Sequence, residues 1–163
     1  MTKAMLHFRR RRENKTDYKK RLSLIRSGVP RLVIRQTNSR IVLQIVGYSP
    51  KGDVTHVNAA SDELSDYGWK HSGKNLPACY LTGILCAQKA KKKKIAEAIV
   101  DLGLKTPLKG SRMFAAVKGA LDGGLKVPAD AEIFPPAERI TGKHIKDSIP
   151  KDMEEAKAKL LKA

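Results

Sequence analysis

The sequence contains no hydrophobic run long enough to cross a membrane as a helix, and it has only two cysteines, Cys79 and Cys86. A membrane helix needs about 18 or more consecutive apolar residues. The charged N-terminus is not followed by an apolar stretch, as a secretory signal would be. The two cysteines fall on a predicted helix, about 10 Å apart at 1.5 Å per residue, which is too far for a disulfide. We therefore expect reduced core thiols in a cytoplasmic protein without a membrane partner.

Patterns of catalytic and metal sites are also missing. There is no C-x-x-C, paired-histidine, G-x-S-x-G or Walker pattern, so we expect no metal, no cofactor and no enzymatic activity. Carboxylates are scattered along the middle of the chain, at Asp53, Asp62, Glu63, Asp66, Asp101 and Asp122. A two-metal nuclease needs carboxylates that converge on both ions. Such a nuclease on a ribonuclease-H-like sheet, with Asp53 or Asp101 as ligands, remains one rival hypothesis.

Acidic residues are scarce in the first forty positions, where thirteen lysines and arginines face only Glu13 and Asp17. This segment accounts for +11 of the formal net charge of +17. Such a charge density opposes compaction unless a polyanion neutralises it. Nucleic acid, with its closely spaced phosphates, is the simplest partner. An anionic membrane surface and a solubilising tail are the alternatives to this hypothesis.

Several side chains of this basic segment suit RNA. Arginine pairs with phosphate through two parallel hydrogen bonds, lysine acts as a point charge, and Tyr18 offers a stacking ring or a hydroxyl donor. The candidate RNA-binding residues of the segment are Arg9, Arg10, Arg11, Arg12, Lys15, Tyr18, Lys19 and Arg21. A short helix is expected here, capped by Thr16 or Asp17 and ended by Gly28.

Short β-branched runs predict three strands, at residues 31–37, 40–47 and 53–60. Asn38 and Ser39 would form the tight turn between the first two. Each of these two strands has one fully apolar face, so the sheet would bury one side against helices. Arg35 and Gln44 would then lie on the open side.

Helical patterns follow at residues 76–92, 112–121 and 150–162, with a strand between the first two at about residues 97–102. Asn75 and Ser111 stand where N-caps are expected. Since helix, strand and helix alternate, the fourth strand should join the others by a crossover. The predicted fold class is α/β, with a mixed sheet that begins with an antiparallel three-stranded meander, is packed by helices and carries an extended basic N-terminal arm.

The chain length suits one domain with tails. We predict a basic RNA-binding arm at residues 1–28, an α/β core domain at residues 29–127, and an irregular segment with a C-terminal helix at residues 128–163. Pro128, Pro135 and Pro136 mark the irregular segment.

Two further segments are candidate RNA contacts, and each also has a purely structural interpretation. In the polar loop 61–74, Trp69 or His71 could pack on RNA with Lys70 and Lys74 on phosphates, or Trp69 could cover the core edge while His71 is solvated. In the segment 105–112, a glycine-containing loop leads into a helix N-terminus, where backbone N–H groups could bind an anion. Its candidates are Lys109, Gly110, Ser111 and Arg112; an ordinary loop is the alternative.

A third basic run, residues 89–94, ends the first long helix. Cations at a helix C-terminus are favoured by the helix dipole. We slightly favour a solvated or partly engaged helix end over a phosphate clamp.

Four stretches of the chain together resemble a known family. They are residues 9–18 (RRRRENKTDY), 28–46 (GVPRLVIRQTNSRIVLQIV), 75–85 (NLPACYLTGIL) and 101–125 (DLGLKTPLKGSRMFAAVKGALDGGL). They resemble the large-subunit ribosomal protein family that binds 5S rRNA, numbered eighteen in bacteria and archaea and five in eukaryotes. The likeness covers roughly residues 6–145, and the run at residues 109–125 is close to the archaeal and eukaryotic form.

The resemblance implies a structural, non-enzymatic constituent of the cytoplasmic large ribosomal subunit. Its members attach 5S rRNA to 23S rRNA in the central protuberance, beside the other 5S-associated ribosomal protein and neighbouring ribosomal proteins. It implies RNA contacts by the arm, the first hairpin and the glycine-containing loop at residues 105–112. It adds to the candidates Thr16, Arg35, Thr37, Asn38 and Arg40. A sequence-tolerant cationic RNA chaperone is the alternative; it would bind 5S rRNA and random RNA equally.

Overall fold

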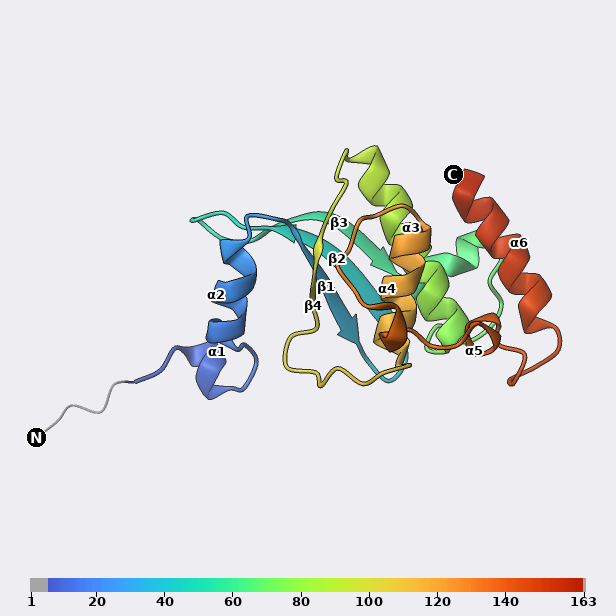
Figure 1. Cartoon of the computed structure of the whole chain (residues 1–163), viewed down its shortest axis with the longest axis horizontal. Helices are drawn as coiled ribbons and strands as arrows, with labels where there is room; N and C mark the ends of the chain where they lie inside the picture. Colours follow the sequence, from blue (N-terminus) through green and yellow to red (C-terminus); the bar gives the residue numbers. More distant parts are fainter. Residues whose placement is uncertain (1–5, 163) are drawn as a thin grey trace, which may run out of the picture.

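In the computed structural model, the chain folds into a four-stranded sheet that helices cover on one face (Figure 1). The basic arm lies at one end of the molecule. The structure describes residues 6–162. Residues 1–5 of the predicted arm and residue 163 of the predicted C-terminal segment lie outside the described residues.

The sheet has the order β3-β2-β1-β4. Its strands are β1 (Arg31–Gln36), β2 (Ile41–Gly47), β3 (Val54–Ala60) and β4 (Ile99–Asp101). The first three form the predicted antiparallel meander, and β4 pairs parallel with β1 after a crossover. This confirms the predicted fold class. The fourth strand is shorter than expected, because Glu97 leaves the ladder and makes an isolated parallel bridge with Lys126.

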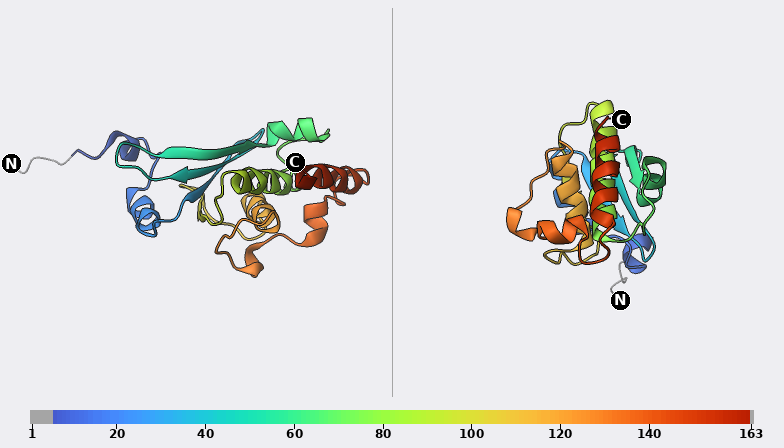
Figure 2. Two further views of the ribbon diagram at one scale, coloured as in Figure 1. Left: turned by 90° about the horizontal axis from the view of Figure 1, so that it is seen from above. Right: turned by 90° about the vertical axis from the view of Figure 1, so that its right-hand side faces the viewer.

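Helix α3 (Leu76–Lys92) forms the centre of the core. Thirteen of its seventeen residues are buried, because the sheet covers one side of it and α4 (Arg112–Asp122) and α6 (Ile149–Lys162) cover others. Figure 2 shows this layering of sheet, α3 and α4. Close approach of α3 and α4 requires glycine, because a Cβ on Gly83 would collide with the Ala116 carbonyl and one on Gly119 with the Tyr80 carbonyl. The helix boundaries predicted for α3 are confirmed.

The expected polar loop begins instead with a 3₁₀ helix, η1 (Ser61–Tyr67). The Ala60 N–H donates to the Glu63 carboxylate at 3.1 Å, which caps this turn and was not read from the sequence. The predicted irregular segment contains η2 (Ala131–Ile133) and α5 (Ala137–Thr141). Beyond it α6 packs on α3, and its buried residues include Ile149, Met153, Ala156 and Leu160.

The arm is helical over much of its described length, with α1 (Arg9–Arg12) and α2 (Tyr18–Arg26). The Asp17 carboxylate accepts the N–H groups of Lys19 and Lys20, at 3.0 and 3.1 Å, and caps α2 as one of the two predicted caps. The helix ends before Gly28, whose φ of +71° suits glycine.

Both cysteines are free and buried in α3, as expected. Burial raises the pKa of Cys79 and of Cys86 to about 12, so both thiols are protonated at neutral pH. Among the described residues, no helix combines the length and the apolar character that a membrane crossing requires.

Candidate nucleic-acid interface

The arginines of α1 are exposed at the end of the molecule. Glu13 is the carboxylate closest to them in sequence, and it accepts from Arg9 Nε at 2.7 Å and from Lys15 Nζ at 2.8 Å. The hydrogen bond from Arg9, followed by that from Lys15, lowers the pKa of the Glu13 carboxyl. Arg10 Nε donates to Thr16 Oγ1 at 2.9 Å, which fixes its direction without cancelling its charge. Most of the positive charge of the arm therefore remains available to a polyanion.

Tyr18 packs against Phe8, with ring centroids 5.3 Å apart and a tilted geometry. Phe8 is 73% exposed, so the pair presents an aromatic surface beside the arginines. Exposed rings next to arginines are a common platform for unpaired bases. Tyr18 was a predicted RNA contact and Phe8 was not, although Phe8 stands directly before four arginines in the sequence.

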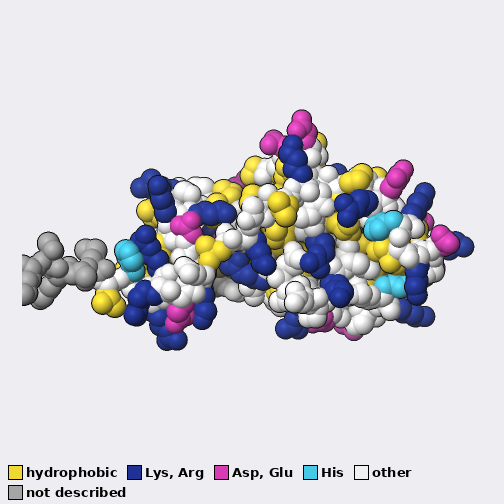
Figure 3. Space-filling model, turned by 90° about the horizontal axis from the view of Figure 1, so that it is seen from below, with side chains coloured by type: hydrophobic (Ala, Val, Ile, Leu, Met, Phe, Trp, Pro, Cys, Tyr) yellow, Lys and Arg dark blue, Asp and Glu magenta, His cyan; other side chains and the backbone are white. Residues whose placement is uncertain are grey.

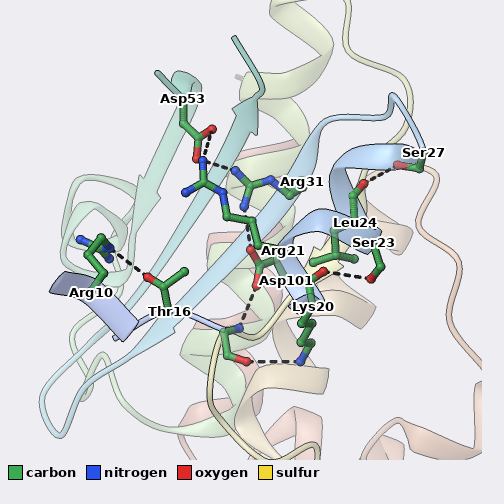
Figure 4. A network of polar contacts seen from close by, with 11 residues as sticks. Arg10, Thr16, Lys20, Arg21, Ser23, Leu24, Ser27, Arg31, Asp53 and Asp101 are labelled. Carbon is green, nitrogen blue, oxygen red and sulfur yellow. Dashed lines mark hydrogen bonds and ion pairs between the residues drawn. The ribbon is translucent and has the colours of Figure 1, made fainter. Parts of the chain in front are cut away.

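A chain of ion pairs joins the arm to the sheet (Figure 4). Arg21 Nη2 donates to Asp53 Oδ1 at 2.9 Å, and Arg31 Nη2 donates to Asp53 Oδ2 at 2.6 Å. Arg31 Nη1 then donates to Asp101 Oδ2 at 2.9 Å. The chain thus links α2, the turn before β3, β1 and β4, and we call it the Arg–Asp chain. Three of its members, Arg31, Asp53 and Asp101, were not among the predicted RNA-binding residues.

In the Arg–Asp chain, Asp53 and Asp101 bind arginine side chains. Both carboxylates named as candidate ligands in the nuclease hypothesis bind the guanidinium of Arg31. The described residues contain no group of three or more His, Cys, Asp or Glu side chains placed to hold a metal ion. The two carboxylates therefore hold the Arg31 side chain in place and connect β1 with β4 and with the turn before β3.

The tip of the first hairpin is held by its own polar groups. Thr37 Oγ1 donates to the Arg40 carbonyl at 2.9 Å and accepts the Arg40 N–H at 3.1 Å. The Arg40 side chain pairs with Asp62 of η1 at 2.6 Å. Arg35 and Asn38 are exposed. The structure thus presents these two candidates outward, while Thr37 and Arg40 have partners within the chain.

In the loop around Trp69, the tryptophan covers the edge of the core, which is one of the two predicted alternatives. Trp69 is 5% exposed and belongs to the hydrophobic core, and its Nε1 lies 3.4 Å from the Ser72 carbonyl. Its ring face is therefore not available for stacking in this conformation. His71 is not simply solvated, because its Nε2 lies 2.6 Å from Asp152 Oδ2 of α6. Lys70 and Lys74 are exposed and stay predicted RNA contacts.

The glycine loop before α4 differs from the expected anion site. The Gly110 N–H donates to the Ile133 carbonyl at 2.9 Å, so it does not point to an open site. Ser111 stands at the N-cap position but makes no side-chain cap bond, and its Oγ is buried without a partner. Arg112 Nη1 donates to the Lys74 carbonyl at 3.1 Å and so brings two predicted loops together. Lys109, exposed and 3.4 Å from Glu132, stays a predicted contact.

The basic run at residues 89–94 is a partly engaged and otherwise solvated helix end, as we favoured from the sequence. Lys89 pairs with Glu63 and donates to the Asn58 carbonyl at 2.9 Å. The four following lysines are exposed. Lys and Arg side chains are spread along the face of the molecule shown in Figure 3, from the arm to the opposite end.

Comparisons with known proteins agree on one group. The family described as "Ribosomal large subunit proteins 60S L5, and 50S L18" matches residues 3–100 and 88–130. "Large ribosomal subunit protein uL18" of Korarchaeum cryptofilum is 54% identical over 138 residues, which cover 85% of this chain and 71% of that protein. The protein with the same description in Thermofilum pendens is 53% identical over 137 residues, covering 84% and 70% of the two chains.

Proposed function

The chain belongs to the ribosomal large-subunit protein family of 60S L5 and 50S L18, and on this basis we propose that it binds 5S rRNA and attaches it to 23S rRNA in the central protuberance. Membership makes it a constituent of the large ribosomal subunit, in a family that is structural rather than enzymatic. The finer assignment, to 5S rRNA and its junction with 23S rRNA, is our proposal.

The observation that carries the proposal is the exposed arginine cluster of α1, held at one end of the molecule by an arm that docks on the sheet. Phosphate contacts supply most of the affinity for RNA and fix the register of a protein on it. Arg9 to Arg12 would contact phosphates, and the rings of Phe8 and Tyr18 would meet unpaired bases.

The remaining predicted contacts would extend the interface from the arm onto the domain. Arg35 and Asn38 are exposed on or beside β1, and Lys70, Lys74 and Lys109 on the loops. The arm at residues 1–28 would thus be the main RNA-binding region and the α/β core at residues 29–127 its platform.

Charge along the sequence suggests where protein neighbours would lie. Residues 1–122 contain 25 lysines and arginines against nine acidic residues, whereas residues 123–163 contain eight against seven. A nearly neutral surface has little attraction for phosphates. We propose that the segment at residues 128–163, including α6, faces ribosomal proteins, among them the other 5S-associated protein, or solvent.

The test is a competition titration of 5S rRNA against random RNA of equal length at several salt concentrations. The proposal expects a preference for 5S rRNA that persists as salt rises, because shape and unpaired bases add to the phosphate contacts. Equal affinity for both RNAs, fading together with salt, would instead identify a sequence-tolerant cationic RNA chaperone.

A further inference from the structure

A cavity of about 450 Å³ opens between the arm and the sheet, beside the Arg–Asp chain. Cations from both sides line it: Arg10, Lys15, Lys20 and Arg21 from the arm, and Arg31 and Arg35 from β1. Its volume lies in the range of about 300–1,000 Å³ that is typical of small-ligand sites.

The carboxylates in the cavity wall are already engaged. Asp17 caps α2, and Asp53 and Asp101 bind the guanidinium of Arg31. Six cations and three carboxylates line the cavity, so its formal charge is +3. An excess of this size in a partly enclosed space attracts an anion.

Three of the lining cations have no carboxylate partner among the described residues. Arg10 donates to the Thr16 hydroxyl, Lys20 Nζ donates to the Gly103 carbonyl at 3.2 Å, and Arg35 passes beside Gly103. Arg10 and Lys20 are thus oriented by neutral acceptors, and no ion pair within residues 6–162 offsets the charge of any of the three cations. Together they come from α1, α2 and β1, so the cavity is assembled only when the arm is docked.

The base of the cavity is rigid because its central cation is buried. Arg31 is 5% exposed and is held from two sides by carboxylates. Asp101 also accepts the Gly103 N–H at 2.9 Å, which fixes the loop after β4. Because this base holds the arm and the loop after β4 in place, the cations that they carry lose little freedom when they bind a phosphate.

We propose that this cavity is a phosphate-binding pocket that takes one backbone phosphate of the bound rRNA, with Arg10, Lys20 and Arg35 as its ligands. Arg31, Asp53 and Asp101 are positioning residues that dock the arm and shape the pocket. The identity of the RNA rests on the function proposed above, whereas the affinity of the pocket for phosphate does not. On this proposal the arm is already docked on the sheet when it binds RNA.

The first experiment titrates the full chain with pyrophosphate at low salt and follows backbone amide signals by NMR. A 1:1 complex that shifts Gly52 and Gly103, which line the cavity, is expected. The double variant Lys20→Gln, Arg35→Gln should weaken pyrophosphate about tenfold, since it removes two charged ligands. A control that removes two exposed cations outside the cavity, Arg26→Gln with Lys92→Gln, should bind as the parent does. Shifts spread over all basic segments, or equal losses in both double variants, would overturn the pocket.

Asp53→Asn separates positioning from simple electrostatics. Removing a negative charge beside an anion should strengthen its binding by charge alone. Positioning predicts weaker pyrophosphate binding, because Arg21 and Arg31 lose the carboxylate that holds them together. Unchanged or tighter binding by the folded variant would overturn the positioning role.

A third experiment tests whether the phosphate comes from the RNA. The Lys20→Gln, Arg35→Gln variant should lower the affinity for 5S rRNA and reduce the salt slope by about 0.7–0.9 per lost phosphate contact. Intact rRNA affinity with lost pyrophosphate binding would overturn the assignment to RNA. Failure of the 5S preference in the parent protein, by contrast, would leave the pyrophosphate results standing, so the two proposals fail separately.

Discussion

Arg31 Nη1 donates to Asp101 Oδ2 at 2.9 Å across the parallel pair of β1 and β4, and both side chains are almost entirely buried. The strand β4 is only three residues long, so few backbone bonds hold it to the sheet. The ion pair therefore adds a side-chain connection where the backbone ladder is shortest, next to the loop that receives the arm.

Loss of Asp101 should be strongly destabilising. Asp101→Ala leaves the buried Arg31 with one carboxylate and removes the acceptor of the Gly103 N–H. We expect the free energy of unfolding in urea to fall by about 3 kcal/mol. The matched control is Asp62→Ala, which breaks the exposed pair with Arg40 and should cost about 0–1 kcal/mol. Similar losses for both would contradict the structural role of the buried pair.

Glycine at the α3–α4 crossing should not tolerate a methyl group. A Cβ on Gly83 would meet the backbone of α4, which has no flexible side chain to yield. We expect Gly83→Ala to lower the free energy of unfolding by about 3 kcal/mol, near the upper end for overpacking. Gly28→Ala is the comparison: its added Cβ meets nothing within 4 Å, and the positive φ alone should cost about 1 kcal/mol. Equal effects would place the helices further apart than described.

Buried thiols predict a stability loss at alkaline pH. Burial raises the pKa of Cys79 and of Cys86 to about 12, from the ordinary thiol value of 9.0. Below about pH 9 both states keep their protons. Between about pH 9 and 12 the unfolded state releases them first, so stability should fall by about 1.4 kcal/mol per pH unit for each thiol. Urea titrations of the parent and of Cys79→Ala, Cys86→Ala across this range measure the difference. Parallel profiles would mean that the thiols are accessible.

The two central arginines of α1 should contribute phosphate contacts. Arg10→Ala with Arg11→Ala should weaken binding to 5S rRNA and reduce the slope of log affinity against log salt by about 1 to 2. Lys91→Ala with Lys92→Ala removes the same charge from the exposed end of α3 and should change the slope much less. If the arm variant keeps the full slope, the arm is outside the interface.

Trp69 should report folding and not RNA binding. It is the single tryptophan and lies in the core. Its fluorescence should therefore change on unfolding in urea and stay unchanged when 5S rRNA is added to the folded protein. Quenching that saturates with the rRNA would show that a base stacks on this ring and that the loop opens on binding.

Local patterns in the sequence were sufficient for most of the fold. Strand alternation predicted the meander, Asn75 and Pro77 predicted the start of α3, and Asp17 was one of the two caps named for α2. The 3₁₀ turn of η1 was missed because its cap is the Glu63 side chain reaching back to the Ala60 N–H. Short 3₁₀ segments have weak sequence signatures.

The candidate site was less accessible from the sequence. Exposed charge in the arm followed directly from its composition, but the Arg–Asp chain joins residues 22 and 70 positions from Arg31. Nothing local marks Asp53 or Asp101 as partners of one guanidinium. Similarly, the pairing of His71 with Asp152 of α6 and the use of the Gly110 N–H by the Ile133 carbonyl of η2 depend on segments distant in sequence.

Docking of the arm also has a consequence for the order of synthesis. Lys20 and its acceptor at Gly103 are 83 residues apart. At about 5–20 residues per second, the contact becomes possible about 4–17 s after Lys20 is translated. During that interval the nascent chain displays its densest positive charge without the surface on which it folds. Premature capture by any nearby polyanion is therefore a hazard that begins with the first turn of α1 and ends only when β4 is made.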